Sequence, residues 1–309
     1  MMHLLFSVAL GIGLLLCGIF CMRQGLENLL GGRLRKLITT ITVNPWRGLL
    51  VGIFASALMQ SSTAVSLITI GLVSANYLSF YQSLGIILGA NIGTCTTVQL
   101  MTLSLPGNAI YPLLLLSVII MIFVRRLRCL AMAVSGLLSI FAGIEMLSAA
   151  ISNISELHVA LQYILAGKTN ALYGIAGGML ITLLLQSSSA ATAVLMVFAA
   201  DGTIDLTTAA YVVYGNNIGS CISSVMIAAA APLAAKRVAA AHVILNIAGA
   251  IIFLPFTGLL TAFTTLLCAD FAGQIALLHT LFNLLSSLAV MPFAKQYAQL
   301  IIFLIPGRK

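Results

Sequence analysis

The sequence predicts an all-α polytopic membrane protein built as an inverted repeat, and three observations support this fold class. Of the 309 residues, 61% are hydrophobic and only 6% are charged, and apolar runs of about 20 residues, enough to cross a bilayer, recur along the chain. Residues 48–95 repeat without a gap at 174–221, with 12 identities in 48 positions. Threading the chain through a membrane collects the basic residues on one face. We expect about seven full transmembrane helices and two re-entrant helical hairpins.

The first repeat is expected at 1–126 and begins with an apolar helix. A basic amphipathic stretch follows, of the kind that lies in the membrane interface. The next two apolar segments have about 14 residues each, too few to cross a core of about 30 Å at 1.5 Å per residue, so we expect a hairpin that enters and leaves on one side. The elements are predicted at 4–22 (helix), 23–44 (interfacial helix), 46–75 (hairpin), 82–104 (helix broken at 89–94) and 109–124 (helix).

The second repeat is expected at 127–256 with the same order, and 257–309 adds an extra C-terminal helix and an apolar tail. Three crossings per repeat is an odd number, so the repeats are antiparallel and the hairpin tips approach the midplane from opposite sides. The elements are predicted at 129–149 (helix), 151–167 (weakly amphipathic), 171–200 (hairpin), 206–229 (helix broken at 215–220), 238–256 (helix) and 271–293 (extra helix).

This threading places 13 of the 14 Lys and Arg residues on one face, with Lys168 alone on the other. The positive-inside rule identifies the basic face as the cytoplasm. We therefore expect a multi-pass protein of the cell inner (plasma) membrane, with its N-terminus outside and its C-terminus cytoplasmic. The net charge of +8 then reflects topology in a lipid bilayer, and we expect no nucleic-acid partner.

The residues argue against an enzyme or a channel. The six cysteines lie in apolar segments without a Cys-x-x-Cys pair, no P-loop pattern is present, and no nucleophile–base pair or metal cluster is evident. We therefore expect no catalytic residues. A channel would need a continuous polar face along its helices, and outside two polar motifs the sequence offers none.

These two polar motifs recur at an offset of 126 residues within otherwise apolar sequence. Gln-Ser-Ser occupies 60–62 and 186–188, and Gly-x-Asn-Ile-Gly occupies 89–93 and 215–219. Ser and Thr often hold membrane helices together and glycines allow close helix packing, so each motif alone has a purely structural interpretation. Two copies in corresponding positions favour the binding site of a transporter.

Each Gln-Ser-Ser motif is expected between two half-helices, where the start of the second helix offers free N–H groups and a positive dipole end to an anion. The donors would be the N–H groups of 62–64 and 188–190, with the Ser and Thr hydroxyls and the Gln amides. Neither motif contains Lys, Arg or His, so a cation must accompany the anion. We expect Na⁺ at the second motif, where unwound glycine segments would free carbonyl oxygens beside hard side-chain ligands. The expected sodium ligands are Asn91, Thr94, Asn217, Ser220, Gln60 and Gln186.

At these residues the chain resembles the type II sodium-phosphate cotransporters, whose two inverted repeats each carry Gln-Ser-Ser-Ser followed by Gly-x-Asn-Ile-Gly-Thr. The second Gln-Ser-Ser-Ser matches in full, and the first has Thr63 in the last position. Segments 241–246 and 278–283 also resemble the family's His-x-x-Phe-Asn. The resemblance implies sodium-coupled import of inorganic phosphate, with Na⁺ as the co-transported ion and without the PhoU-like tail of many bacterial relatives. The implied phosphate-binding residues are Gln60, Ser61, Ser62, Thr63, Gln186, Ser187, Ser188 and Ser189.

Two alternatives remain open on the residues themselves. Helix ends and hydroxyls do not by themselves select phosphate over another oxyanion or a small carboxylate. Protons would replace sodium as the coupling ion if His242, His279 or Glu145 took part. Lone histidines in apolar helices are more often packing residues, whereas a carboxylate within a membrane span is a functional candidate.

Overall fold

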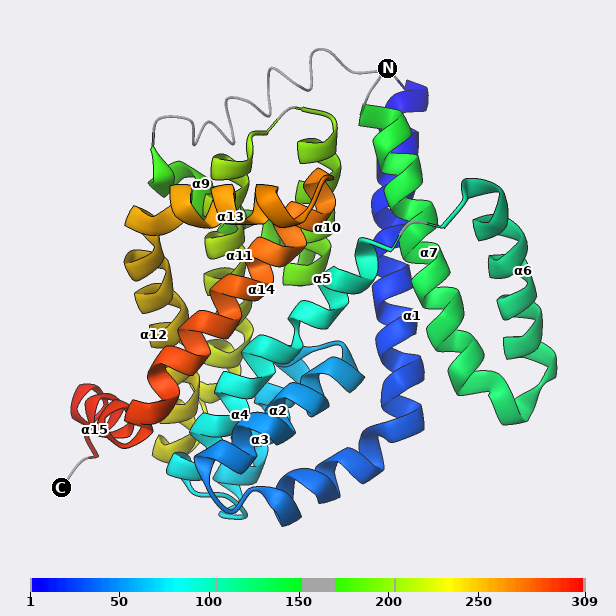
Figure 1. Ribbon diagram of the computed structural model, residues 1–309. Coiled ribbons are helices and arrows are strands. Elements are labelled where there is room, and N and C mark those ends of the chain that lie inside the picture. The colour runs from blue at the N-terminus through cyan, green and yellow to red at the C-terminus, as the bar shows by residue number, and fades with distance from the viewer. Residues whose placement is uncertain (1, 104, 152–169, 203, 308–309) are drawn as a thin grey trace. The chain divides into compact units, whose positions relative to one another are not determined.

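A computed structural model describes residues 2–103, 105–151, 170–202 and 204–307, and the regular elements in these ranges are all helices (Figure 1). The amphipathic segment expected at 151–167 lies outside the described residues except for its first residue, and so does Lys168. The chain divides into two compact units. Unit 1 comprises Met1–Leu29, Val98–Asn216 and Thr257–Leu278, and unit 2 comprises Leu30–Thr97, Asn217–Phe256 and His279–Lys309.

Among the described residues, five stretches of helix are long and apolar enough to cross a membrane, where the sequence led us to expect about seven. They are Phe6–Leu30, Phe80–Met101, Arg125–Ala150, Leu233–Leu267 and Phe271–Leu304.

The two expected spans that do not qualify fail for different reasons. Helix α6, Gly107–Phe123, is apolar but has only 17 residues. Helix α11, Leu206–Ala228, has 23 residues, but the polar side chains of the Gly-Asn-Asn-Ile-Gly-Ser segment lower its mean hydropathy.

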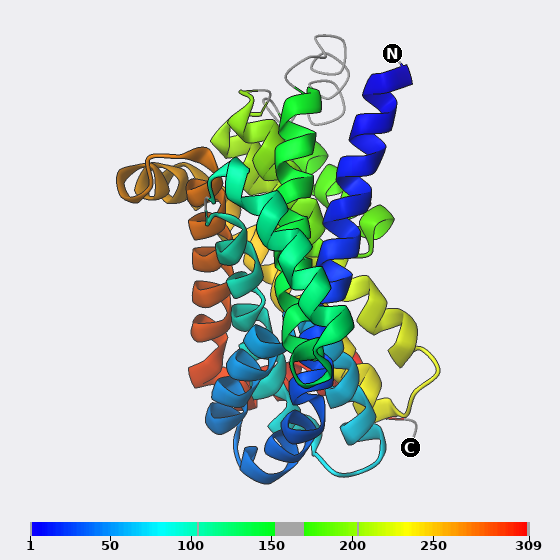
Figure 2. The same ribbon diagram turned by 90° about the vertical axis from the view of Figure 1, so that its right-hand side faces the viewer.

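Helix α1 runs from Met2 to Ile41 without interruption, so the expected boundary between an apolar helix and a separate interfacial helix at residue 23 is wrong. The reason lies in the backbone, because no proline removes an N–H group until Pro45. Within unit 1, α1 packs against α7, Arg128–Ile151, and Figure 2 shows the two helices side by side. The two backbones are in close contact, as Gly18 shows. A Cβ atom added there would lie 2.6 Å from the carbonyl oxygen of Gly136.

Four short helices form two helix–turn–helix pairs at the positions expected for the hairpins. Hairpin A consists of α2, Pro45–Met59, and α3, Ser62–Ser74, which contact each other in unit 2. Hairpin B consists of α9, Ala171–Leu185, and α10, Ser188–Ala200, which contact each other in unit 1. Each hairpin starts at an asparagine cap. The side-chain oxygens of Asn44 and Asn170 accept hydrogen bonds from the N–H groups of Arg47 and Leu172, each at 2.9 Å.

The glycines of the Gly-x-Asn-Ile-Gly motifs serve helix packing, and the expected unwinding is largely absent. Helices α4, Phe80–Gly93, and α5, Cys95–Met101, are separated only at Thr94, whose N–H still bonds to the carbonyl of Ala90 at 3.1 Å. Helix α11 runs through 215–220 without a break. A Cβ at Gly89 would lie 2.0 Å from a carbonyl oxygen of α2, and one at Gly215 would lie 2.0 Å from a carbonyl oxygen of α9. Glycine is needed there for close approach, which is the structural alternative noted for this motif.

The remaining elements complete both units. They are η1, Arg125–Leu127, α12, Leu233–Phe253, η2, Leu254–Phe256, α13, Thr257–Leu267, α14, Phe271–Val290, η3, Met291–Phe293, and α15, Ala294–Leu304.

Candidate functional site

Both hairpin tips use the same backbone turn. Gln60 has φ 51° and ψ 30°, and Gln186 has φ 52° and ψ 24°, which is the left-handed region that a side chain disfavours. Among the described residues, only Asn76 joins them as a non-glycine residue with positive φ. Each glutamine amide donates to the carbonyl three residues earlier, that of Ala57 or of Leu183. Strained backbone of this kind, duplicated at two equivalent places, is typical of functional sites.

The first serine of each motif caps the following helix. The hydroxyl oxygen of Ser61 accepts a hydrogen bond from the N–H of Ala64 at 3.1 Å, and that of Ser187 accepts one from Ala190 at 3.3 Å. The N–H groups of these two alanines were expected to be available to an anion, and this expectation is wrong because the cap occupies them. The first two N–H groups of α3 and of α10 still lack an intrahelical acceptor.

The side chains around the two tips differ in exposure. Gln60 is 4% exposed, and its amide also donates to the hydroxyl of Thr96 at 3.2 Å. Gln186 is exposed. Of the residues that follow, Ser62 and Ser189 are buried at 5% and 1% exposure, whereas their counterparts Ser188 and Thr63 are half-buried. Hairpin A belongs to unit 2 and hairpin B to unit 1, so each tip has its own local environment.

In unit 2, Asn91 of the first sequence half lies against residues of the second half. Its amide nitrogen donates to the side-chain oxygen of Asn246 at 3.4 Å. The amide nitrogen of Asn246 in turn lies 3.3 Å from the sulfur of Cys221 and 3.0 Å from the carbonyl oxygen of His242. Both asparagines are buried, so the structure brings together amide groups that are 155 residues apart in sequence.

A matching arrangement surrounds Asn283 in the same unit. Its amide nitrogen donates to the carbonyl oxygen of His279 at 3.0 Å, and the sulfur of Cys95 lies 3.8 Å from that same carbonyl. Cys95 and Cys221 are 126 residues apart, so each Gly-x-Asn-Ile-Gly helix packs on a His-x-x-x-Asn helix in the same way. In the described part of the chain, the side-chain oxygen of Asn283 is buried without a hydrogen-bond partner. Sequence reasoning noted these segments only as a resemblance and did not connect them with Asn91.

The other expected sodium ligands are either buried or already hydrogen-bonded. Asn217 and Thr94 are buried, and the hydroxyl of Ser220 donates to the backbone carbonyl of Asn217 at 2.7 Å. Asn216, which sequence reasoning passed over, is fully buried and bonds to both helices of hairpin B. Its side-chain oxygen accepts from Thr182 and its amide nitrogen donates to Thr192, each at 3.1 Å.

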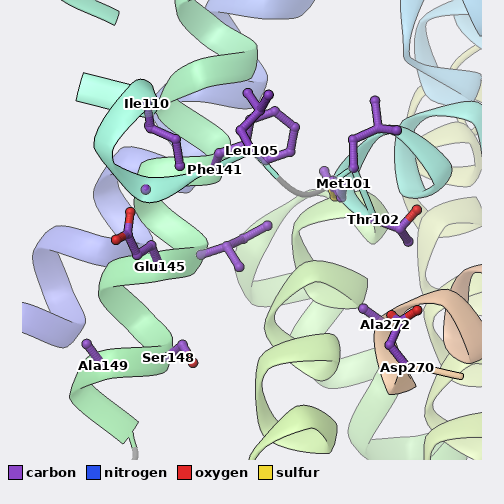
Figure 3. Close-up of a pocket in the computed structure, with 13 residues that line it drawn as sticks. Met101, Thr102, Leu105, Ile110, Phe141, Glu145, Ser148, Ala149, Asp270 and Ala272 are labelled. Atoms are coloured by element: carbon purple, nitrogen blue, oxygen red, sulfur yellow. The ribbon is translucent and has the colours of Figure 1, made fainter. Parts of the chain in front are cut away.

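The candidates for proton coupling have contrasting surroundings. His242 and His279 are 2% exposed, and their ring nitrogens have no hydrogen-bond partner among the described residues. Glu145 is exposed and faces an open cavity of about 850 Å³ in unit 1, which Asp270 also lines (Figure 3). No residue of either hairpin tip lines this cavity.

Comparison with known proteins agrees with the duplicated motifs. A sequence model described as Na+/Pi-cotransporter matches residues 14–149 and 152–291. The chain is 32% identical over 99% of its length to the whole of "Uncharacterized protein YqeW" of Bacillus subtilis. It is 29% identical over 97% of its length to "Putative inorganic phosphate export protein YjbB" of Escherichia coli, of which it spans 54%.

A shorter match links the chain to an animal protein. Over 84 residues, 26% of this chain and 12% of the relative, it is 34% identical to the human "Sodium-dependent phosphate transport protein 2B". No solved structure matches. Because the family model covers nearly the whole chain, the resemblance carried by the duplicated motifs is confirmed. The chain belongs to the Na+/Pi-cotransporter family, a family of phosphate transporters and not of enzymes.

Proposed function

We propose that this chain is a sodium-coupled secondary transporter that imports inorganic phosphate by alternating access, with the anion held at the two Gln-Ser-Ser tips and Na⁺ near Asn91 and Asn217. The observation that carries the proposal is the duplicated tip turn. In both copies a left-handed glutamine is followed by a capping serine and the start of a helix.

The tips suit an anion because their donors are pre-arranged. With Ser61 and Ser187 engaged as caps, the N–H groups and hydroxyls of the following residues, Ser62 and Thr63 or Ser188 and Ser189, supply neutral donors. Each sits at the positive end of a helix dipole. Donors held in place in a low-dielectric site lose little entropy when an oxyanion binds.

Amide oxygens suit Na⁺, a hard cation that prefers oxygen ligands. Asn91 lies beside Asn246 at 3.4 Å, and the buried oxygen of Asn283 adds a further candidate ligand. The glycine helices are not unwound, so the ligands in this proposal are side chains and not freed carbonyls. Linkage requires that phosphate raise sodium affinity by the same factor by which sodium raises phosphate affinity.

Sodium coupling is tested by titrating phosphate binding at several sodium concentrations, with choline keeping the ionic strength constant. Asn91→Ala and Asn217→Ala should lower sodium affinity first and phosphate affinity as a consequence, while the exposed Asn108→Ala serves as the control. Phosphate affinity that is indifferent to sodium would contradict the mechanism. Proton coupling through His242, His279 or Glu145, or transport of another oxyanion or a small carboxylate, would then be the better interpretation.

The direction of transport has a second candidate, since the printed name of the Escherichia coli relative refers to phosphate export. Radiolabelled phosphate flux in proteoliposomes decides between them. A symporter follows the sodium gradient, so flux should reverse when the gradient is reversed. Efflux that persists under an inward sodium gradient would favour export.

The proposed topology keeps the two inverted repeats at 1–126 and 127–256, with both hairpins re-entrant and the additional segment at 257–309. Cysteines introduced beside Arg126 and Arg237 should then react only with reagents on the cytoplasmic side, and one beside Asp201 only from outside. Reaction of the first two sites from opposite sides would contradict the inverted repeat.

A further inference from the structure

Arg23 places a formal positive charge at the tip of hairpin B. It lies on α1 within the apolar stretch Phe6–Leu30, and its guanidinium nitrogen Nη2 is 3.4 Å from the hydroxyl oxygen of Ser187. Both residues belong to unit 1. An ionisable side chain within a membrane span is costly, and such residues are by default candidates for function.

The guanidinium adds to a charge that is already present. Ser187 caps α10, so the free N–H groups at the start of that helix carry about half a positive charge. Two positive groups that meet in a region of low dielectric repel each other, and a bound anion relieves this repulsion. The position 126 residues after Arg23 is Ala149, so the second repeat carries no matching charge.

We infer that Arg23 is a phosphate-binding residue of hairpin B, where its planar fork contacts oxygens of the anion beside the donors of Ser188 and Ser189. The inference rests on the proposed function and adds a preference for the phosphate dianion over the monoanion. A fixed positive charge stabilises the phosphate dianion more than the monoanion, so affinity should rise with pH as phosphate loses its second proton. Arginine suits this task because its fork matches two oxygens of one oxyanion.

The test measures binding of radiolabelled inorganic phosphate to the purified full chain at saturating sodium, at roughly pH 6 and pH 8, which span the second ionisation of a phosphate group. Arg23→Gln should weaken binding by about 10- to 100-fold at the higher pH, as expected for loss of a hydrogen-bonded charge. It should also reduce the rise in affinity with pH, because only Na⁺ and the helix ends would then favour the dianion. Arg23→Lys should keep that rise but weaken binding about threefold to tenfold, because a point charge cannot replace the fork. Arg126→Gln, at an exposed position, should change neither.

The outcomes separate this inference from the proposed function. A wild-type chain that binds no phosphate contradicts both. If the wild type binds phosphate and Arg23→Gln keeps its affinity and pH dependence, Arg23 only holds α1 against hairpin B, and the proposed function stands without it. If Arg23→Gln does not yield a monodisperse protein, Arg23→Lys provides the test. Wild-type phosphate affinity in Arg23→Lys would contradict a contact between the Arg23 guanidinium and phosphate.

Discussion

Hairpin B is bridged in its middle by one side chain, whereas the residues that the structure describes form no such bridge in hairpin A. Asn216 of α11 bonds to Thr182 of α9 and Thr192 of α10, each at 3.1 Å. The equivalent positions around hairpin A, 126 residues earlier, are Ala90, Ser56 and Ser66. Within the described structure the hydroxyls of both serines are buried without a partner.

At the tips the asymmetry is reversed. Gln60 of hairpin A is buried and bonds to Thr96 at 3.2 Å. In the second half Gln186 is exposed, and the residue equivalent to Thr96 is Ile222, which has no hydroxyl to offer. Gln60 therefore bonds hairpin A to Thr96 at its tip, whereas hairpin B is bonded in its stem by Asn216 and at its tip by Arg23 through Ser187. The two copies therefore share the backbone turn and its serine cap, while the side-chain bonds around it differ.

The largest effect is expected from removing the bridge. Asn216→Ala removes two buried hydrogen bonds and leaves the Thr182 hydroxyl unsatisfied, so the opening free energy of hairpin B should fall by about 2–4 kcal/mol. Hydrogen–deuterium exchange of α9 and α10 measures this, with Asn108→Ala as an exposed control. Unchanged protection in hairpin B would show that the bridge contributes nothing.

The next effect concerns the substrate. Ser62→Ala and Ser188→Ala should each weaken phosphate binding by about 1.5–3 kcal/mol, the usual contribution of a hydrogen bond to a charged group. Comparing their dissociation constants tests whether the two tips contribute equally despite their different surroundings. If both variants bind phosphate as tightly as the wild type, the serine motifs do not hold the anion.

A smaller effect distinguishes the two glutamines. Gln60→Ala loses its bond to Thr96 in a buried setting and should lower stability by about 1–2 kcal/mol. Gln186→Ala, at an exposed tip, should cost less than about 1 kcal/mol. Thermal unfolding of the two variants in the same detergent compares them, and an equal loss would remove the distinction drawn between the tips.

The smallest effect is a gain. The triple variant Ser56→Thr, Ser66→Thr, Ala90→Asn transfers the bridge of hairpin B to hairpin A and should increase protection of α2 and α3 by about 1 kcal/mol. Ser56→Thr with Ser66→Thr alone is the matched control, because it adds the methyl groups without the amide. A triple variant less protected than this control would mean that hairpin A has no room for the amide.

The sequence predicted the hairpins well because their signals are local. A short apolar length and a polar tip predict hairpin A at 46–75 and hairpin B at 171–200, close to the observed helices. The glycine motif was misinterpreted because glycine favours both unwinding and close packing. Only the position of a partner carbonyl decides between these two, and sequence does not contain it.

Two functional candidates were missed for a related reason. The contact between Arg23 and Ser187 joins residues 164 positions apart, and its only sequence signal is an arginine in an apolar run. Asn216 differs from its counterpart Ala90 inside an otherwise matching motif. That difference was visible, but its meaning depends on two threonines that only the fold brings near.

The glycine contacts of α4 restrict how this helix can move along hairpin A. Cβ atoms at Gly85, Gly89 and Gly93 would lie 1.9, 2.0 and 2.4 Å from carbonyl oxygens of α2, those of Pro45, Leu49 and Ile53. Both rows advance by four residues, so a slide of one helical turn, about 6 Å, restores two of the three contacts. A smaller slide moves the three glycines out of register with these carbonyls. At the position equivalent to Gly85, α11 carries Tyr211, so a slide that brings residue 211 to the carbonyl of Ile175 is blocked beside hairpin B. The glycine row of α4 therefore fits hairpin A in more than one register, whereas Tyr211 blocks the equivalent slide of α11 in one direction.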